Sequence, residues 1–195
     1  MTGQAFATQA TFRPVSHFGS SVPRWGHCRM DRDSISALQR IDIFNAVWSG
    51  ALLTTLLPGE TGRTGQSSVH IVNGLKDPMF GTIESVELLS AMNIEQARTL
   101  FLCNLSLVQE KLRDLKVQDQ PARFGIAVDA EALAMLGGEL RIIAQHTPHL
   151  FARLQVTALM NENATLSSVQ HDQLTALEAL GLTIDMRRVL SDRPA

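Results

Sequence analysis

Asp77-Pro-Met-Phe-Gly-Thr-Ile-Glu-Ser-Val-Glu-Leu-Leu89 is the stretch of sequence on which the interpretation of the fold depends. Residues 77–81 combine Asp, Pro and Gly and predict a turn. Residues 83–89 are mostly β-branched or apolar and predict a strand, although Glu84 and Glu87 interrupt it. Ligands of α/β folds bind at the carboxyl ends of the strands. A carboxylate here is therefore either a site residue or a strand end that faces solvent.

The motifs around this stretch resemble, in order and spacing, those of EAL domains, a family that hydrolyses cyclic-di-GMP on a TIM-like barrel. Glu87-Leu88-Leu89 stands where the family has the Glu-Ala-Leu triplet that gives it its name. Asn73-Gly-Leu-Lys-Asp77 stands where the family has Gln-Pro-Ile-Val-Asp. The resemblance runs from about residue 69 to residue 186. It implies an α/β fold, a partial (incomplete) TIM-like EAL barrel with an extra N-terminal helix.

The resemblance also identifies the positions that correspond to the metal ligands of the family. Ala127 replaces an Asn, Leu159 a Glu and Arg187 an Asp, so Glu87 is the one ligand retained among the aligned positions. Hard divalent cations need several oxygen ligands, so we expect no metal, no cofactor and no catalytic residue. Asp185 lies two residues before Arg187 and on the same strand face, so it could still point into the interior. The degenerate EAL-site positions are Glu87, Leu88, Leu89, Ala127, Leu159, Glu162 and Arg187.

Three further features bear on function through the same resemblance. Ser90 stands where non-catalytic receptors of the family usually have an Arg that pairs with a phosphate, and this replacement argues against cyclic-di-GMP binding. Asn161-Glu162-Asn163 matches the Asn-Glu-Asn of the EAL-like flagellar anti-activators. The sequence ends at Ala195, so we expect the later family strands, with their Lys, Glu and Gln, to be missing.

The chain is thus interpreted as a non-catalytic EAL-like regulator that acts by binding a protein, such as a transcription regulator of flagellar motility. One alternative is a cyclic-di-GMP receptor or a residual cyclic-di-GMP phosphodiesterase. A third interpretation is a non-functional remnant of a longer gene. Unpaired strand edges of an open barrel need cover from the N-terminal helix or from a second subunit, which predicts a possible homodimer.

Composition excludes several other classes of function. The chain has 195 residues, a net charge of -2 and 45% hydrophobic residues, which is ordinary for one globular domain. This charge balance argues against direct nucleic-acid binding. Two cysteines, Cys28 and Cys103, indicate no disulfide framework and favour a reducing cytoplasm. No apolar run approaches the roughly 20 residues of a membrane span.

Four segments are predicted along the chain. Residues 1–32 have no acidic residue before Asp31 and are predicted to be disordered. Residues 33–68 are predicted to form a helix over 34–57, whose apolar face includes Phe44 and Trp48, and a Gly/Ser/Thr-rich linker. The truncated EAL-like domain follows over residues 69–190, and residues 191–195 form a tail.

Within the EAL-like domain, strands are predicted at 69–72, 124–129 and 154–163, and near Ile184. A long helix begins after Asn93, with Gln96 completing a capping box. Its predicted buried stripe is Ala97, Phe101, Leu105, Val108, Leu112 and Leu115. Asp129 is predicted to cap the helix after its strand, and Gly181 to end the last helix.

Overall fold

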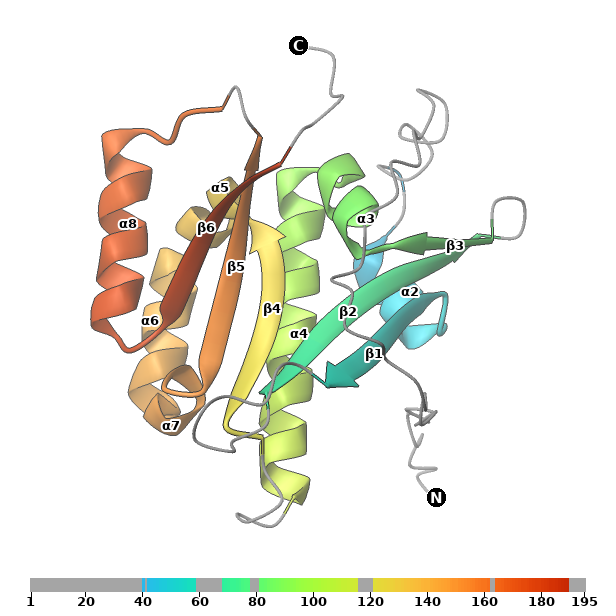
Figure 1. The fold of residues 1–195 in the computed structure, drawn as a ribbon, viewed down its shortest axis with the longest axis horizontal. Helices are drawn as coiled ribbons and strands as arrows, with labels where there is room; N and C mark the ends of the chain where they lie inside the picture. The colour runs from blue at the N-terminus through green and yellow to red at the C-terminus, as the bar shows by residue number, and fades with distance from the viewer. Residues whose placement is uncertain are drawn as a thin grey trace, which may run out of the picture.

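The computed structural model describes residues 40, 42–58, 68–77, 81–115, 121–161 and 164–189, except for the side chains of Trp48 and of residues 75–77 and 81–87. Figure 1 shows the arrangement of the elements. They are, in chain order, α2 (Ile43–Trp48), β1 (Leu52–Pro58), β2 (Ser68–Asp77), β3 (Gly81–Glu84), α3 (Ser85–Ala91), α4 (Ile94–Asp114), β4 (Arg123–Asp129), α5 (Ala130–Met135), α6 (Gly137–His146), α7 (Pro148–Phe151), β5 (Leu154–Asn161), α8 (Ser168–Ala179) and β6 (Thr183–Val189).

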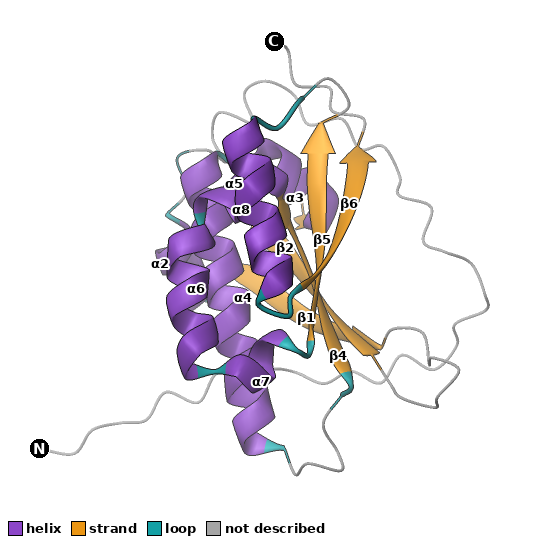
Figure 2. Ribbon diagram, turned by 90° about the vertical axis from the view of Figure 1, so that its left-hand side faces the viewer, coloured by secondary structure: helices purple, strands orange, loops and turns teal. Residues whose placement is uncertain are grey.

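The strands form one six-stranded sheet with the order β1-β2-β4-β5-β6, and β3 pairs with the end of β2. Strands β2, β4, β5 and β6 are parallel to one another, whereas β1 runs antiparallel to β2. Helices α4 to α8 lie on one side of the strands (Figure 2). The α/β class is therefore confirmed, and within the described residues the sheet is open instead of closed into a barrel.

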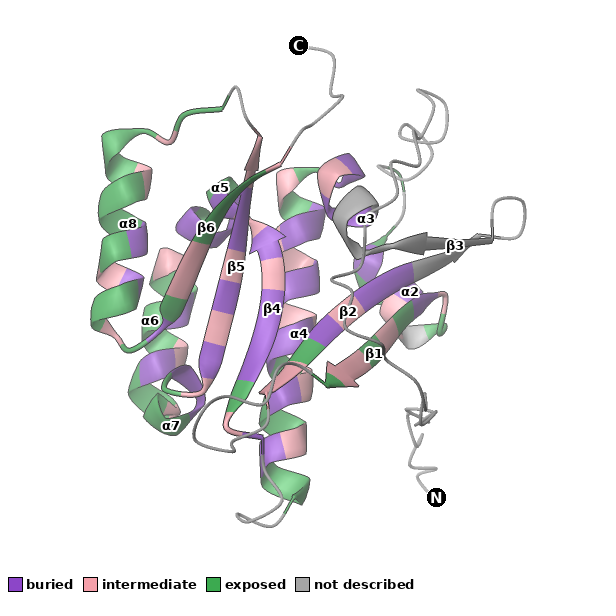
Figure 3. Cartoon of the chain, in the orientation of Figure 1, coloured by how far each residue is buried: buried purple, intermediate pink, exposed green. Residues whose placement is uncertain are grey.

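The core lies between the sheet and this helix layer. Side chains alternate between the two faces of a strand, and in β4 and β5 every second residue is apolar and points to the helices. Ile126, Val128 and Val156 are completely or almost completely buried there, together with Phe101 of α4. Figure 3 shows this buried band along β4, β5 and the inner side of α4.

Helix α4 begins as the sequence predicts. The Asn93 side chain accepts from the Gln96 backbone N–H at 2.9 Å, and the Gln96 side chain accepts from the Asn93 N–H at 3.1 Å. This reciprocal pair is the predicted capping box, so it is confirmed. Five of the six predicted stripe residues are buried, but Leu115 is exposed because it follows the last helical turn.

The predicted helix over 34–57 is wrong in its second half. The described helix, α2, is six residues long, and Leu52–Pro58 is strand β1, paired with β2 along its whole length. Leu-Leu-Thr-Thr-Leu-Leu satisfies helical spacing but also suits a strand, and such short apolar runs cannot be assigned by periodicity alone. Pairing with β2 satisfies the backbone of β1 and decides the outcome.

The predicted strand over 83–89 is wrong after Glu84. Strand β3 ends there, and α3 places Glu87-Leu88-Leu89 in a helix. Leu88 and Leu89 are both buried, in a cluster with Met92. Neighbouring residues in a strand point to opposite faces, whereas a helix can bury all three of these side chains on one side.

Strand β2 is also longer than the predicted strand 69–72. Some predictions concern segments outside the described residues. These segments are residues 1–32, residues 33–39 and 41 at the start of the predicted helix, the linker at 59–67, residues 78–80 of the predicted turn, residues 162–163, and residues 190–195.

Candidate functional site

The candidate site is the sheet face opposite the helix layer, called here the open face. On β4, residues that alternate with the buried Ile126 and Val128 point to it. Strand pairing then fixes the open-face residues of the neighbouring strands, because paired residues share a face. The open face contains His70, Val72, Gly125, Ala127, Asp129, Gln155, Thr157, Leu159, Asp185 and Arg187.

The positions identified through the EAL resemblance come together on this face. Ala127 pairs with Thr157, which pairs with Asp185. One step further along the strands, Asp129 pairs with Leu159, which pairs with Arg187. Ala127, Leu159 and Arg187 therefore occupy two adjacent rows of the same surface.

The side chains in these two rows are either apolar or already paired with another group of the protein. Leu159 is buried and packs beside Ala127 in the smaller hydrophobic cluster. The Arg187 guanidinium donates from Nε to Asp185 Oδ2 at 2.8 Å, so Asp185 does share the face, with its carboxylate held by a cation. The Asp129 Oδ1 accepts from the backbone N–H groups of Glu131 and Ala132 at 2.9 and 3.1 Å, which confirms its predicted role as a helix cap.

The remaining predicted site positions lie on α3 or are not described. Leu88 and Leu89 of α3 are buried in the same hydrophobic cluster as Leu159, so the structure brings these three predicted positions together, and Ser90 is half-buried beside them. Glu87 belongs to the same helix, but its side chain is outside the described part of the structure. Glu162 is outside it as well.

A close contact between His70 and Gly125 was missed in the sequence. These residues pair across β2 and β4. A Cβ atom at position 125 would lie 2.8 Å from His70 Cε1 and 3.2 Å from His70 Cγ, and closer still to Nδ1. The imidazole thus lies in the space left by the missing side chain. An isolated Gly inside a strand is the signal for such an approach.

A buried amide pair lies on the opposite side of the sheet. Asn73 of β2 and Asn104 of α4 donate to each other, with N–O distances of 3.1 and 2.8 Å, and Asn73 also donates to the Thr54 hydroxyl at 3.1 Å. Both amides are buried. The pair satisfies their polar groups and joins β1, β2 and α4, so its role is structural.

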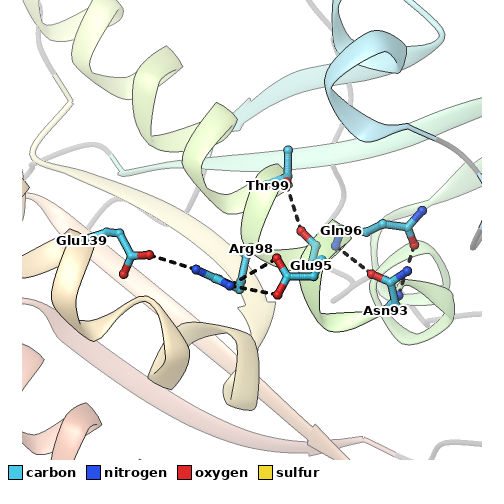
Figure 4. Close-up of polar contacts among 6 residues, drawn as sticks. All are labelled: Asn93, Glu95, Gln96, Arg98, Thr99 and Glu139. Atoms are coloured by element: carbon cyan, nitrogen blue, oxygen red, sulfur yellow. Dashed lines mark hydrogen bonds and ion pairs between the residues drawn. The ribbon is translucent and has the colours of Figure 1, made fainter.

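Charged residues at the start of α4 form a second polar cluster, shown in Figure 4. Arg98 donates to Glu95 on its own helix and to Glu139 of α6, both at 2.9 Å. Thr99 donates to the Glu95 carbonyl at 2.9 Å. The Arg98 Nε is buried without a hydrogen-bond partner in the described structure. This cluster ties α4 to α6 within the helix layer, away from the open face.

The described residues contain no recognisable metal site, because no group of three or more His, Cys, Asp or Glu side chains among them is placed to hold a metal ion. Among the described helices, none combines the length and apolar character needed to cross a bilayer.

Comparison with known proteins places the fold. No protein-family model and no curated protein matches this sequence. Two structures of Vibrio cholerae LapD are similar, each containing the S helix, GGDEF and EAL regions, one in the apo form and one bound to c-di-GMP. Each has a TM-score of 0.50 and 10% sequence identity. The match covers 80% of this chain and 37% of the LapD chain.

The fold is EAL-like. At 10% identity the similarity extends to the fold alone. It agrees with the topology, since successive parallel strands joined by helices on one face are the building pattern of a TIM-like barrel. This chain spans a little over a third of the LapD chain.

Proposed function

We propose that this chain is a non-catalytic regulatory protein that acts by binding another protein through its open face. The observation that supports this proposal is the chemistry of Ala127, Leu159 and Arg187. The strand register brings them onto one surface, where they offer a methyl group, a buried isobutyl group and a guanidinium paired with Asp185.

Phosphodiester hydrolysis by an EAL-type site depends on divalent cations that lower the pKa of the attacking water. Such cations need several oxygen ligands, and an alkyl group or a guanidinium supplies none. Asp129 and Asp185 do carry oxygens on this face, but Asp129 Oδ1 accepts from two backbone N–H groups and Asp185 Oδ2 accepts from Arg187. Two such carboxylates fall short of the several oxygen ligands that a hard cation requires.

The composition of the open face suits a protein partner. The half-buried apolar residues Val72 and Ala127 lie there beside Gln155, Thr157 and the Asp185–Arg187 pair. Protein interfaces combine apolar contact area with polar groups that fix the register. The resemblance to EAL-like flagellar anti-activators suggests a transcription regulator as the partner, and the proposed action involves neither direct nucleic-acid contact nor a membrane.

The second candidate is a cyclic-di-GMP receptor. One LapD structure of similar fold is bound to c-di-GMP, and Arg187 places a cation on the open face of this chain. Asp185 neutralises that cation at 2.8 Å, which weakens the case for phosphate binding. We therefore rank this function second.

Two measurements test these proposals. The full chain is first incubated with cyclic-di-GMP and magnesium or manganese, and we expect no linear dinucleotide above the buffer rate. Product that disappears in Glu87→Gln would contradict the non-catalytic assignment. Calorimetric titration with cyclic-di-GMP then separates the candidates, because micromolar binding that is lost in Arg187→Ala would favour the receptor.

Capture of partners from cells tests the protein-binding role directly. The bait is the full chain, compared with Thr157→Arg on the open face and with Glu178→Arg on the exposed side of α8. We expect a DNA-binding regulator to be captured by the unaltered chain and by Glu178→Arg, but not by Thr157→Arg. Equal capture by all three baits would exclude the open face as the binding surface.

A further inference from the structure

Strand β6 lies at one end of the sheet order, so in the described structure one of its edges faces no other strand. Edge strands present backbone N–H and C=O groups that can pair with another chain. Four of the seven residues of β6 are exposed, and the other three are half-buried. Figure 1 shows β6 at this border of the sheet, with α8 beside it.

The two charges on the open-face side of β6 are arranged symmetrically about its centre, whereas Arg188 lies on the helix-side face. Asp185 and Arg187 lie on the same face, one on each side of Met186. Their side chains are 41% and 64% exposed, so both remain accessible to a neighbouring chain. A strand with opposite charges at equal distances from a central residue is complementary to its own antiparallel copy.

We propose that β6 pairs antiparallel with β6 of a second copy of this chain, around a two-fold axis at Met186. In this register each Asp185 lies opposite the partner's Arg187, and each Arg187 lies opposite the partner's Asp185. The two existing ion pairs become a cluster of four alternating charges. The sheet then continues from one subunit into the other. This inference shares Asp185 and Arg187 with the open face, but the sedimentation test below needs no binding partner and so can fail or succeed separately from the proposed function.

The charges also select this register over its neighbours. The axis is perpendicular to the sheet, so side chains keep their faces and the register shifts in steps of two residues. One such shift places Arg187 opposite the partner's Arg187, and the shift in the other direction places Asp185 opposite the partner's Asp185. Like charges directly opposite each other destabilise strand pairing.

Met186 contributes an apolar contact at the centre. It lies on the helix-side face of β6, opposite Ala158 of β5, and is 43% exposed. At the two-fold axis it meets the partner's Met186, which removes exposed apolar surface from water.

The other sheet edge lacks these features. Strand β1 has no charged residue in Leu-Leu-Thr-Thr-Leu-Leu-Pro, so no charge selects a register. It ends at Pro58, which has no N–H to donate to a neighbouring strand. The second copy is therefore assigned to β6.

Charge reversal on the full chain tests this pairing by sedimentation equilibrium. We expect a dimer for the unaltered chain, and a dissociation constant raised about tenfold or more for Asp185→Arg alone and for Arg187→Asp alone. The decisive sample is an equimolar mixture of these two variants. Their complementary charges should form a heterodimer about as tight as the unaltered dimer, which a change within one subunit could not produce.

Arg113→Asp and Asp114→Arg supply the matched control, since they reverse another exposed ion pair, at the end of α4. Neither variant should change the dissociation constant. A monomeric unaltered chain at tens of micromolar would overturn the proposal. A mixture of Asp185→Arg and Arg187→Asp that stays monomeric would also overturn it, whatever the unaltered chain does.

Discussion

The two faces of the sheet differ in what they contribute to the protein. The helix-side face buries large apolar side chains such as Phe124 and Ile126 under α4, and its buried amides, Asn73 and Asn104, are hydrogen-bonded to each other. The open face combines apolar and polar residues and places His70 and Arg187 in contact with solvent. Both faces belong to the same strands, and only the side-chain direction separates them.

This difference suggests that the two faces of the sheet contribute differently to the stability of the fold. Residues on the helix-side face are constrained by close packing, where the loss of even one methylene is felt. On the open face the end near α3 is closely packed, where Leu159 is buried, but His70 and Arg187 are exposed. Exposed or half-buried open-face positions such as Ala127 and Arg187 should therefore tolerate substitution while the fold remains. The predictions below test this difference, from the largest expected effect to the smallest.

Phe124→Ala should give the largest loss of stability. The side chain is 1% exposed within the main core, so truncation leaves a cavity and should lower the free energy of unfolding by about 3–5 kcal/mol. Urea denaturation measures the change. The matched open-face variant is Thr157→Ala, for which we expect less than about 1 kcal/mol. Equal losses in the two variants would mean that the two faces are packed alike.

Asn104→Ala should have an intermediate effect. It leaves the Asn73 amide buried without its principal partner, which costs about 1–3 kcal/mol in unfolding free energy. Replacing both residues by Leu removes both polar groups and should recover most of that loss. Chemical denaturation of the single and double variants gives the comparison. A double variant less stable than Asn104→Ala would contradict the assigned role of the pair.

Gly125→Ala tests the contact across the open face. The added methyl would displace the His70 ring from its present position, at a cost of about 1 kcal/mol. His70→Ala combined with Gly125→Ala should restore the stability, because the space is then empty. Thermal unfolding of the two single variants and the double variant measures the coupling. Additive effects would show that the imidazole does not occupy this space.

The smallest expected effect concerns the reactivity of the Cys103 thiol and not the stability of the fold. Burial on α4 raises the pKa of its thiol, so at a given pH less of the reactive thiolate is present than in a free cysteine. Iodoacetamide should therefore alkylate the folded Cys28→Ser variant several-fold more slowly at pH 8 than the same variant in urea. Raising the pH should increase the native rate. A native rate equal to the unfolded rate would exclude this effect of burial.

Local chemistry in the sequence predicts part of the fold well. The capping box at Asn93, the cap at Asp129 and the left-handed turn at Gly181, with φ of 98°, all depend on neighbouring residues. Strand β1 and helix α3 were assigned wrongly. Their short apolar segments suit either structure, and contacts with β2 and α4 decide between them.

Part of the candidate site can also be predicted from the sequence. Alternation within a strand shows that Asp185 and Arg187 share a face, and the structure agrees. The salt bridge between them and the position of His70 over Gly125 depend on how neighbouring strands align. Strand register is a tertiary property, so the sequence pattern leaves it open.

The strand order has a consequence for synthesis on the ribosome. From β2 onward, omitting the short β3, each strand lies beside the one made immediately before it. Chains emerge at about 5–20 residues per second, which is slow compared with the closing of a loop. Each new helix and strand can therefore dock onto a sheet that is already outside the ribosome, without waiting for a distant partner. Among the described strands β6 docks last, and until it does, one edge of β5 has no strand beside it.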